Sequence, residues 1–336
     1  MANLRANKIV GIGSTDAGVV FHGDTKINSQ GYMYFPTGDT SQRSRGRGIL
    51  FGGGSPGRTD RIDYIDIPSG GNSIDFGNLA CGSVWGSGAG ASSTRGVFWG
   101  GENQYTKLDY ITIATTANAT SFGTSSNQSN GGTCMSSETR AVFVLTGGNI
   151  MEYVTIATTG NTTDFGDQNA GALSLASGLA SPTRGIVSGG YGPSPYPQSN
   201  TIEYITIATT GNASDFGDLT FGHSGHFGVS NTTRGVFAKG YTFPSPATVY
   251  YNTIEYITIA STGNATDFGD ATNSVTQGYS HASHIRGVFA GGTAASDINN
   301  IDYVTIATTG NAVDFGDTYS ATRGGSGTSD CHGGIA

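Results

Sequence analysis

The chain has 336 residues, 55 of them glycine, and a formal net charge of −8 with only four lysines. Because a nucleic-acid-binding protein needs a basic surface, this balance argues against nucleic acid as a partner. The glycines follow no G-X-Y register, which excludes collagen, and the abundance of Thr, Ile, Val, Tyr and Phe indicates strands and turns. No apolar run approaches about 18 residues and no signal-peptide core is present, so we expect neither membrane insertion nor export.

The first part of the chain, residues 1–42, differs from the rest of the sequence. Residues 8–37 contain three short apolar stretches, around NKIVGIG, AGVVFHG and GYMYFP, and each is typical of a short strand. We expect these strands to take part in closing the fold.

From residue 43 onward one pattern is repeated six times. Each copy opens with an R-G-V-F-x-G-G-like phrase, continues with I-[DE]-Y-[IV]-T-I and closes with a D-F-G-like phrase. The acid-to-Phe distance is 13 residues in every copy and the Phe-to-next-Arg distance is 18 or 19, whereas the Arg-to-acid distance varies from 12 to 21. The repeated residues are Arg47, Arg95, Arg140, Arg184, Arg234 and Arg286, and Asp63, Asp109, Glu152, Glu203, Glu255 and Asp302. A fixed frame with one variable loop per copy is typical of a binding scaffold.

Each copy contains signals for four strands. In Ile254–Ile259 apolar residues fall on both faces, which indicates a strand buried on both sides. Gly263 and Asn264 come next, and both tolerate positive φ, so a hairpin between the Tyr strand and the Phe strand explains the fixed spacing. A Gly- and Ser-rich strand is expected before the next Arg. Four strands in about 47 residues is the size of a β-propeller blade, and the alternative, a β-solenoid, usually needs fewer residues per coil.

The ends of the chain decide the number of blades. The tail after Phe315 aligns with the stretch that precedes an Arg in the other copies, so it supplies one further strand. Added to the three strands of residues 8–37, it predicts a seventh, hybrid blade that removes the exposed sheet edges. We therefore expect an all-β fold, a β-propeller of seven four-stranded blades, with the six repeats in residues 43–336, ring closure by residues 1–42, and six blades as the alternative.

The repeat wording carries a resemblance to known families. The Gly-Gly-ended strand and the blade length resemble kelch-type propellers. The phrase I-E-Y-I-T-I-A-T-T-G-N-A-[ST]-D-F-G-D (202–218 and 254–270) and the terminal His-Gly-Gly resemble repeats of tail-fibre and other virion proteins of marine bacteriophages. Residues 4–10 and 31–40 also look like the start of phage fibre or appendage chains. The resemblance implies a virion protein assembled in the cytoplasm of a bacterial host, with residues 1–42 docking on the particle; without an accessory domain or a metal-ligand set, kelch-type oxidase activity does not carry over.

The repeated charges allow two interpretations. They could form a charged ring around a central channel, or each Arg could pair with a carboxylate, within or between blades, and fix the strand register. We prefer the second interpretation, in which the twelve repeated charged residues are structural.

The remaining motifs do not point to catalysis. Asp-Phe-Gly imitates a kinase tripeptide but lacks the other kinase elements, and the aspartates beside the Phe are expected to cap turns, with Ca²⁺ binding as the alternative. The H-x-x-H pairs 223/226 and 281/284 could share a metal, although packed or solvated histidines are the simpler interpretation. We expect no cofactor and no metal. Cys81, Cys134 and Cys331 are odd in number and not equivalent, which favours free thiols.

The two longest variable loops, 191–200 and 241–252, are rich in Tyr, Pro, Ser and Asn. Proline lowers the entropy lost on binding and tyrosine offers a large amphipathic surface with few rotors. All such loops join equivalent strands, so we expect them on one face. The predicted contact residues are Tyr191, Tyr196, Tyr241, Phe243, Tyr250 and Tyr251. The alternative is that these loops pack on each other or on a neighbouring virion subunit.

Together these observations predict a binding protein and not an enzyme. The preferred function is a phage tail fibre or appendage protein that binds a host-surface glycan or protein. The alternatives are a decoration protein that contacts only other virion proteins, and a polysaccharide depolymerase, whose two carboxylates the sequence does not single out. A homo-oligomer remains open, because no coiled-coil heptad is present.

Overall fold

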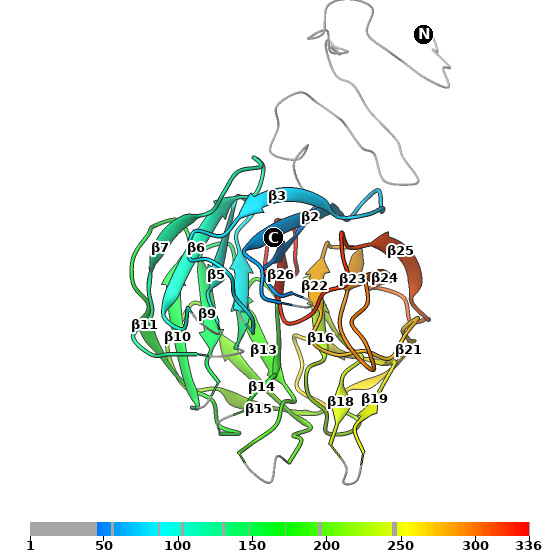
Figure 1. Cartoon of the computed structure of the whole chain (residues 1–336). Coiled ribbons are helices and arrows are strands. Elements are labelled where there is room, and N and C mark those ends of the chain that lie inside the picture. Colours follow the sequence, from blue (N-terminus) through cyan, green and yellow to red (C-terminus); the bar gives the residue numbers. More distant parts are fainter. Residues whose placement is uncertain are drawn as a thin grey trace, which may run out of the picture. The chain divides into compact units, whose positions relative to one another are not determined.

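The computed structural model describes residues 46–335 apart from 55–56, 87, 102–103, 130–131, 147, 172, 194–196 and 244–246. These residues belong to one unit, 46–336, in which strands form six four-stranded antiparallel sheets and one small hairpin (Figure 1). The described residues contain no helix, which confirms the all-β class.

Each sheet is one blade and runs from an inner to an outer strand. Blade 1 contains β26 (Ser326–Ser329), β1 (Arg47–Phe51), β2 (Arg61–Asp66) and β3 (Ile74–Asn78). Blade 2 contains β4 (Gly88–Ala91), β5 (Arg95–Trp99), β6 (Lys107–Thr112) and β7 (Thr120–Thr124). Blade 3 contains β8 (Thr133–Ser136), β9 (Arg140–Val144), β10 (Ile150–Thr155) and β11 (Thr163–Asp167).

The second half repeats this order. Blade 4 contains β12 (Ser177–Ala180), β13 (Arg184–Ser188), β14 (Thr201–Thr206) and β15 (Ser214–Asp218). Blade 5 contains β16 (Phe227–Ser230), β17 (Arg234–Ala238), β20 (Thr253–Thr258) and β21 (Thr266–Asp270), with the hairpin β18 (Tyr241–Thr242) and β19 (Val249–Tyr250) inserted. Blade 6 contains β22 (Tyr279–Ala282), β23 (Arg286–Ala290), β24 (Asn300–Thr305) and β25 (Val313–Asp317).

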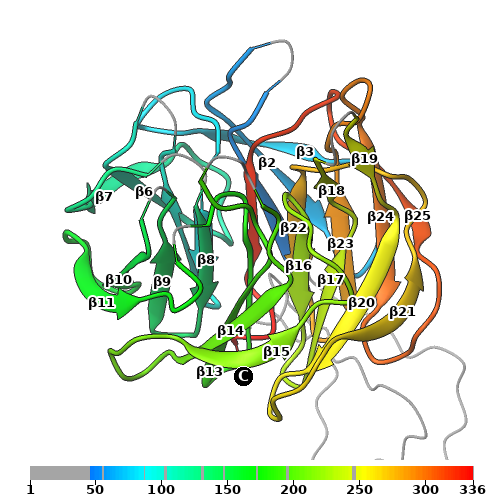
Figure 2. The same ribbon diagram turned by 90° about the horizontal axis from the view of Figure 1, so that it is seen from below.

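The ring closes with six blades, so the preferred count of seven is wrong and the alternative is confirmed. The C-terminal strand is present as expected, but it pairs with β1, with Ile49 opposite Thr328, and becomes the inner strand of blade 1 (Figure 2). The first repeat lacks an inner strand of its own among the described residues, and β26 fills that place. Arg286 of blade 6 donates directly to Ile67 of blade 1. The three strands expected in residues 8–37, and the whole segment 1–42, lie outside the described residues.

The hydrophobic core lies between neighbouring blades. One cluster joins Leu179, Ile186 and Phe216 of blade 4 to Phe237 and Ile257 of blade 5, and equivalent clusters fill the other junctions. The middle strands are apolar on both faces because each blade packs against two neighbours. The predicted hairpin between the Tyr strand and the Phe strand is confirmed in every blade, with a β-bulge beside the acid.

The glycine of the D-F-G phrase is required by the approach of the next blade. Gly217 has φ 148°, and a Cβ on it would lie 2.5 Å from the carbonyl oxygen of Gly263 in blade 5. No side chain fits that gap. The adjacent turn asparagine, Asn264, accepts a hydrogen bond from the backbone N–H of Asp218, at 3.1 Å. The Gly-Asn turn therefore ties each blade to the one before it.

The strand order gives the ring two different faces. The variable Arg-to-acid loops and the connections from one blade to the next emerge on one face, which we name the loop face. The short turns before each repeated Arg and the Gly-Asn turns emerge on the opposite face, the turn face. The expectation that all variable loops share a face follows from this alternation of antiparallel strands.

Candidate binding face

The repeated arginines connect neighbouring blades at the turn face. Nη1 of each Arg donates to the carbonyl oxygen at the end of the Tyr strand in the next blade, over 2.8–3.1 Å. The same guanidinium lies 4.1–4.7 Å from the ring centre of the Tyr in its own blade. That Tyr in turn meets the D-F-G phenylalanine edge to face. Each Arg is thus held by a cation–π contact and bridges two blades.

The expected Arg–carboxylate pair does not form. In blade 5 Arg234 lies opposite Thr258, whereas Glu255 lies opposite Phe237, three residues along the strand. At about 3.3 Å per residue the two charges are about 10 Å apart, at opposite faces of the ring. The diagonal neighbour of Arg234 on its own side of the sheet is Tyr256, which explains the stacking.

The repeated acids connect the blades at the loop face instead. Five of the six accept hydrogen bonds of 2.6–3.3 Å from backbone N–H groups that follow the outer strand of the preceding blade. These are Cys81 to Asp109, Ser126 to Glu152, Asn169 and Ala170 to Glu203, Thr220 to Glu255, and Thr272 to Asp302. Asp63 differs, because it accepts from Arg61 of its own strand at 2.6 Å. The structural interpretation of both charge series agrees with these contacts.

We expect Arg234→Ala to lower the free energy of unfolding by about 2 kcal/mol, because it removes one charged hydrogen bond and one cation–π contact. Ligand binding should stay intact. Lys107→Ala is the matched control, since Lys107 is exposed, and it should change little. Urea unfolding of the two variants measures the difference. Equal stability of the two variants would contradict the proposed role of the arginines as clamps.

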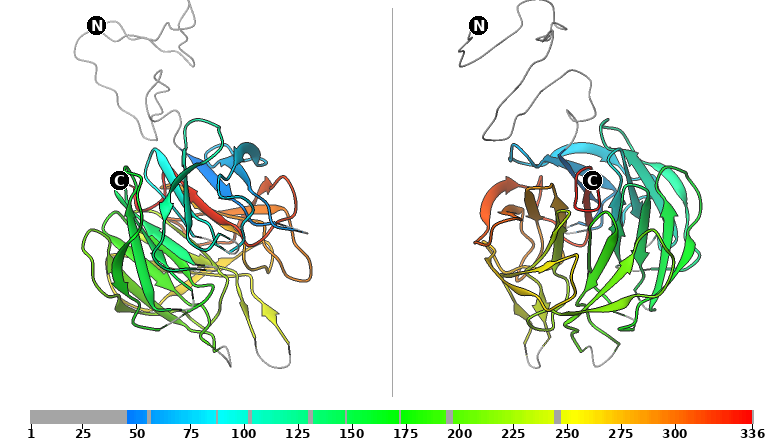
Figure 3. Two further views of the ribbon diagram at one scale, coloured as in Figure 1. Left: turned by 60° about the vertical axis from the view of Figure 1, so that its left-hand side comes forward. Right: turned by 180° about the vertical axis from the view of Figure 1, so that it is seen from behind.

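The two longest loops meet on the loop face. The ring of Phe243 lies edge to face against Tyr241 at 4.7 Å and against Tyr191 at 6.3 Å, and Tyr250 lies 6.2 Å from Tyr241. The backbone N–H of Phe243 donates to Gln198 Oε1 at 3.2 Å, which ties the blade 5 loop to the blade 4 loop. We name Tyr191, Tyr241, Phe243 and Tyr250 the aromatic cluster. Figure 3 shows β18–β19 and the neighbouring β13–β14 loop projecting from the ring side by side.

The members of the cluster differ in exposure. Tyr241 is buried, and burial raises the pKa of its hydroxyl to about 12, so it is the packed base of the cluster. Phe243 keeps 49% of its surface exposed. Tyr251 instead packs on Phe221, 4.7 Å away, and its hydroxyl meets Thr242 Oγ1 at 3.1 Å. Tyr196, the sixth predicted contact residue, lies outside the described residues.

A central channel lies between the inner strands, and none of the twelve repeated charged residues lines its cavities. A cavity of about 130 Å³ opens at the loop face and is lined by small residues of all six inner strands and by Trp85, His226 and Gln277. A second cavity, of about 50 Å³, lies further along the strands. At the turn face the C-terminal tail fills the channel, where His332 Nε2 meets the Ala91 carbonyl at 2.9 Å and Ile335 is buried. The Gly, Ala and Ser content of these strands is the only signal in the sequence.

A third hollow lies on the loop face where blades 6 and 1 meet. It has a volume of about 270 Å³ and is lined by Gly53, Gly54, Gly57, Arg58, Trp85, Asp297 and Arg323. The guanidinium of Arg323 stacks over Trp85 at 5.0 Å, and its Nε lies 3.4 Å from Asp297 Oδ1. This hollow contains cationic and aromatic groups but none of the predicted contact residues.

The histidine pairs are largely buried. His223 and His226 have ring centres 4.5 Å apart, and His226 Nε2 lies 2.9 Å from Ser188 Oγ. Burial lowers the pKa of His223 to about 4. Within the part of the chain that the structure describes, no group of three or more His, Cys, Asp and Glu could hold a metal ion. None of the three cysteines is part of a disulfide, and burial raises the pKa values of Cys81 and Cys134.

None of the described residues forms a helix long and apolar enough to cross a membrane. No protein-family model and no curated protein sequence matches the chain. Among solved structures, YjhT is similar with a TM-score of 0.66 at 10% identity, covering 80% of this chain and 94% of YjhT. At this identity the likeness supports the fold alone, and the resemblance to virion proteins stays a prediction. The chain is a six-bladed β-propeller.

Proposed function

We propose that this protein is an attachment protein of a bacteriophage particle, and that its loop face binds a host-surface glycan or protein around Phe243. The observation that carries the proposal is the aromatic cluster, in which the two longest loops of neighbouring blades combine into one surface. Aromatic anchors that a partner buries carry much of the binding energy in protein interfaces, and the half-exposed Phe243 still offers surface for such burial. The assignment to a phage rests on the repeat wording, and residues 202–218 and 254–270 are its strongest support.

The proposal also rests on the contrast with the turn face, whose repeated contacts hold the blades together. The turn face is occupied by the Arg bridges, the Gly-Asn contacts and the C-terminal tail, all of which connect blades to one another. On the loop face the acids beneath the variable loops hold the blades together, so the ring does not depend on the contacts that the loops make with each other. Sequence changes in the loops therefore alter the surface without disturbing the ring.

We expect the fluorescently labelled full chain to bind host cells, and Phe243→Ala to lose at least tenfold in affinity, which corresponds to about 1.4 kcal/mol. Tyr319→Ala is the matched control, because Tyr319 is an aromatic residue 70% exposed on the same face but outside the cluster. A variant with 191–200 and 241–252 shortened to the 12-residue Arg-to-acid spacing of the third copy should lose all binding.

Equal binding by the two point variants would contradict the placement of the site at the cluster. No binding to any host cell by the unaltered chain would instead favour the second candidate, a decoration or assembly protein that contacts only other virion subunits. The burial of Tyr241 within the cluster favours that candidate, since loops that pack on each other can serve as a rigid contact for a subunit. Release of reducing sugar ends from host polysaccharide would identify the third candidate, a depolymerase.

A further inference from the structure

One residue breaks the repeat at a buried position. Lys239 takes the place that glycine occupies in four of the other five copies, and three of these glycines, Gly52, Gly189 and Gly291, have φ angles between 57° and 61°. Lys239 adopts the same left-handed conformation, with φ 62°, although a side chain is disfavoured there. Its side chain is fully buried. A buried amine on a strained backbone indicates a role beyond filling space.

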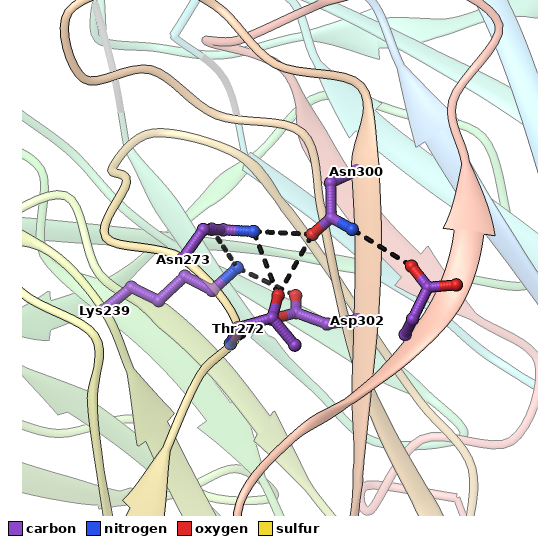
Figure 4. Close-up of polar contacts among 6 residues, drawn as sticks. Lys239, Thr272, Asn273, Asn300 and Asp302 are labelled. Carbon is purple, nitrogen blue, oxygen red and sulfur yellow. Dashed lines mark hydrogen bonds and ion pairs between the residues drawn. The ribbon is translucent and has the colours of Figure 1, made fainter.

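The amine of Lys239 lies between an amide and a carboxylate. Nζ donates to Asn273 Oδ1 at 3.0 Å and to Asp302 Oδ1 at 2.8 Å (Figure 4). The rings of Phe227 and Phe289, with centres 5.2 and 5.8 Å from Nζ, cover the group and are themselves buried. An apolar enclosure of this kind favours a neutral amine over an ammonium.

The amide of Asn273 is held in one orientation by a chain of polar contacts. Its Nδ2 donates to Asn300 Oδ1 at 2.5 Å and to Thr272 Oγ1 at 3.1 Å, and Asn300 Nδ2 donates in turn to Asp314. This orientation places the carbonyl side of Asn273 toward Lys239. The hydroxyl of Thr272 donates to Asp302 Oδ2 at 2.7 Å. The Asp302 carboxylate therefore contacts the amine of Lys239 through Oδ1 and the hydroxyl of Thr272 through Oδ2.

We propose that Lys239 and Asn273 become joined by an intramolecular isopeptide bond, with Asp302 and Thr272 carrying the proton. Nζ of the neutral amine attacks Cγ of Asn273 and forms the new C–N bond. One proton passes from Nζ to Asp302, which becomes a neutral carboxyl group. After this group turns, it gives that proton to Thr272 Oγ1, while the Thr272 hydroxyl gives its own proton to Nδ2, so Asp302 and Thr272 end as they began. The Cγ–Nδ2 bond then breaks and ammonia leaves, so the amine and the amide become one secondary amide plus ammonia, with no oxidant or cofactor.

The electrostatics of the group support this chemistry. Burial lowers the pKa of Lys239, whereas the charge of Asp302 and its hydrogen bond act in the opposite direction. A lowered pKa makes the neutral, nucleophilic amine accessible. The geometry holds the amine and the amide together before reaction, which removes most of the entropic cost of bringing two groups together.

The bond would fasten the binding loop to the ring. Lys239 lies just before β18, and Asn273 lies in the connection from blade 5 to blade 6. The link therefore closes a covalent loop that contains the β18–β19 hairpin and blade 5 strands β20 and β21. A particle protein exposed to the environment gains resistance to unfolding from such a link, although the bond itself does not depend on the proposed function.

Mass spectrometry of the purified, denatured full chain tests the proposal directly. We expect an intact mass lower than that of the sequence by one ammonia. Trypsin should fail to cleave after Lys239, so a single peptide 235–286, one ammonia lighter than calculated, replaces peptides 235–239 and 240–286. A full mass with normal cleavage after Lys239 would overturn the proposal, as would a link to Asp302, which releases water and joins a different peptide.

Three variants separate the chemistry from the fold. Lys239→Gly restores the residue of the other copies and should give a folded chain of full mass. Thr272→Val and Asp302→Asn keep the amine beside the amide but interrupt the proton path, so both should show full mass and cleavage after Lys239 while circular dichroism reports the native fold. A folded Asp302→Asn variant that still loses ammonia as fast as the unaltered chain would contradict the assigned role of the carboxylate.

Discussion

Removal of the C-terminal strand is expected to abolish the cooperative unfolding transition. A chain that ends at Gly325 lacks β26, so β1 keeps β2 but loses its partner on the inner side and becomes an exposed sheet edge. It also loses Asp330, whose Oδ1 accepts from the N–H groups of Gly46 and Arg47 at 2.7 and 3.1 Å. We expect a loss of more than about 5 kcal/mol, which is comparable to the whole stability of many domains. Differential scanning calorimetry measures it.

The control is a chain that ends at His332. It keeps β26 and the Asp330 contacts and loses only the rest of the tail, including the buried Ile335. Burial of one such side chain is worth about 2 kcal/mol, so this variant should melt cooperatively at a moderately lower temperature. If the chain ending at Gly325 melted at the same temperature as the control, the closure of the ring by β26 would be wrong.

Acidification from pH 7 to pH 5 is expected to destabilise the protein strongly. Burial lowers the pKa of His223, His281 and His332 to about 4 and that of His226 well below its usual value. In the unfolded chain these groups titrate near pH 6.5, so between about pH 6.5 and 4 the unfolded state binds more protons and stability falls as the pH falls. Each histidine contributes at most about 1.4 kcal/mol per pH unit in that window.

Three carboxylates act in the opposite direction. Burial raises the pKa values of Asp63, Glu203 and Glu255. At a pH slightly above the usual carboxylate pKa range, the folded state therefore binds more protons at these groups than the unfolded state does. This offsets part of the stability that the histidines remove at the acidic end. The histidines dominate above pH 5. Urea unfolding at pH 7.5, 6.5 and 5.5 measures the slope. His281→Leu should make the slope of stability against pH shallower, because it removes one buried histidine. Leucine should fit there, since the equivalent residues Met135, Leu179 and Val229 are apolar. An unchanged slope would contradict the prediction.

Much of the fold is readable in the spacing of the chain. The constant 13 residues from acid to Phe imply a hairpin, because a tight turn between paired strands leaves no freedom in length. The variable distance from Arg to acid places the changeable loops on one face. The cluster of Tyr191, Tyr241, Phe243 and Tyr250 was anticipated as a set of contact residues, although not as one group formed by two blades. These features depend on neighbouring residues, so local sequence encodes them.

By itself, then, the sequence determined the strands, the hairpins, the repeat and the face that varies. The tertiary structure decided which strand pairs with the tail, and hence six blades and not seven, because any edge strand of similar composition could have accepted it. It also decided that Arg234 bridges to a carbonyl of the next blade. The same packing brings Lys239 to Asn273, in the connection to blade 6, and to Asp302 of blade 6. Such contacts join residues far apart in the chain, and their geometry is set only when the blades pack into a closed ring.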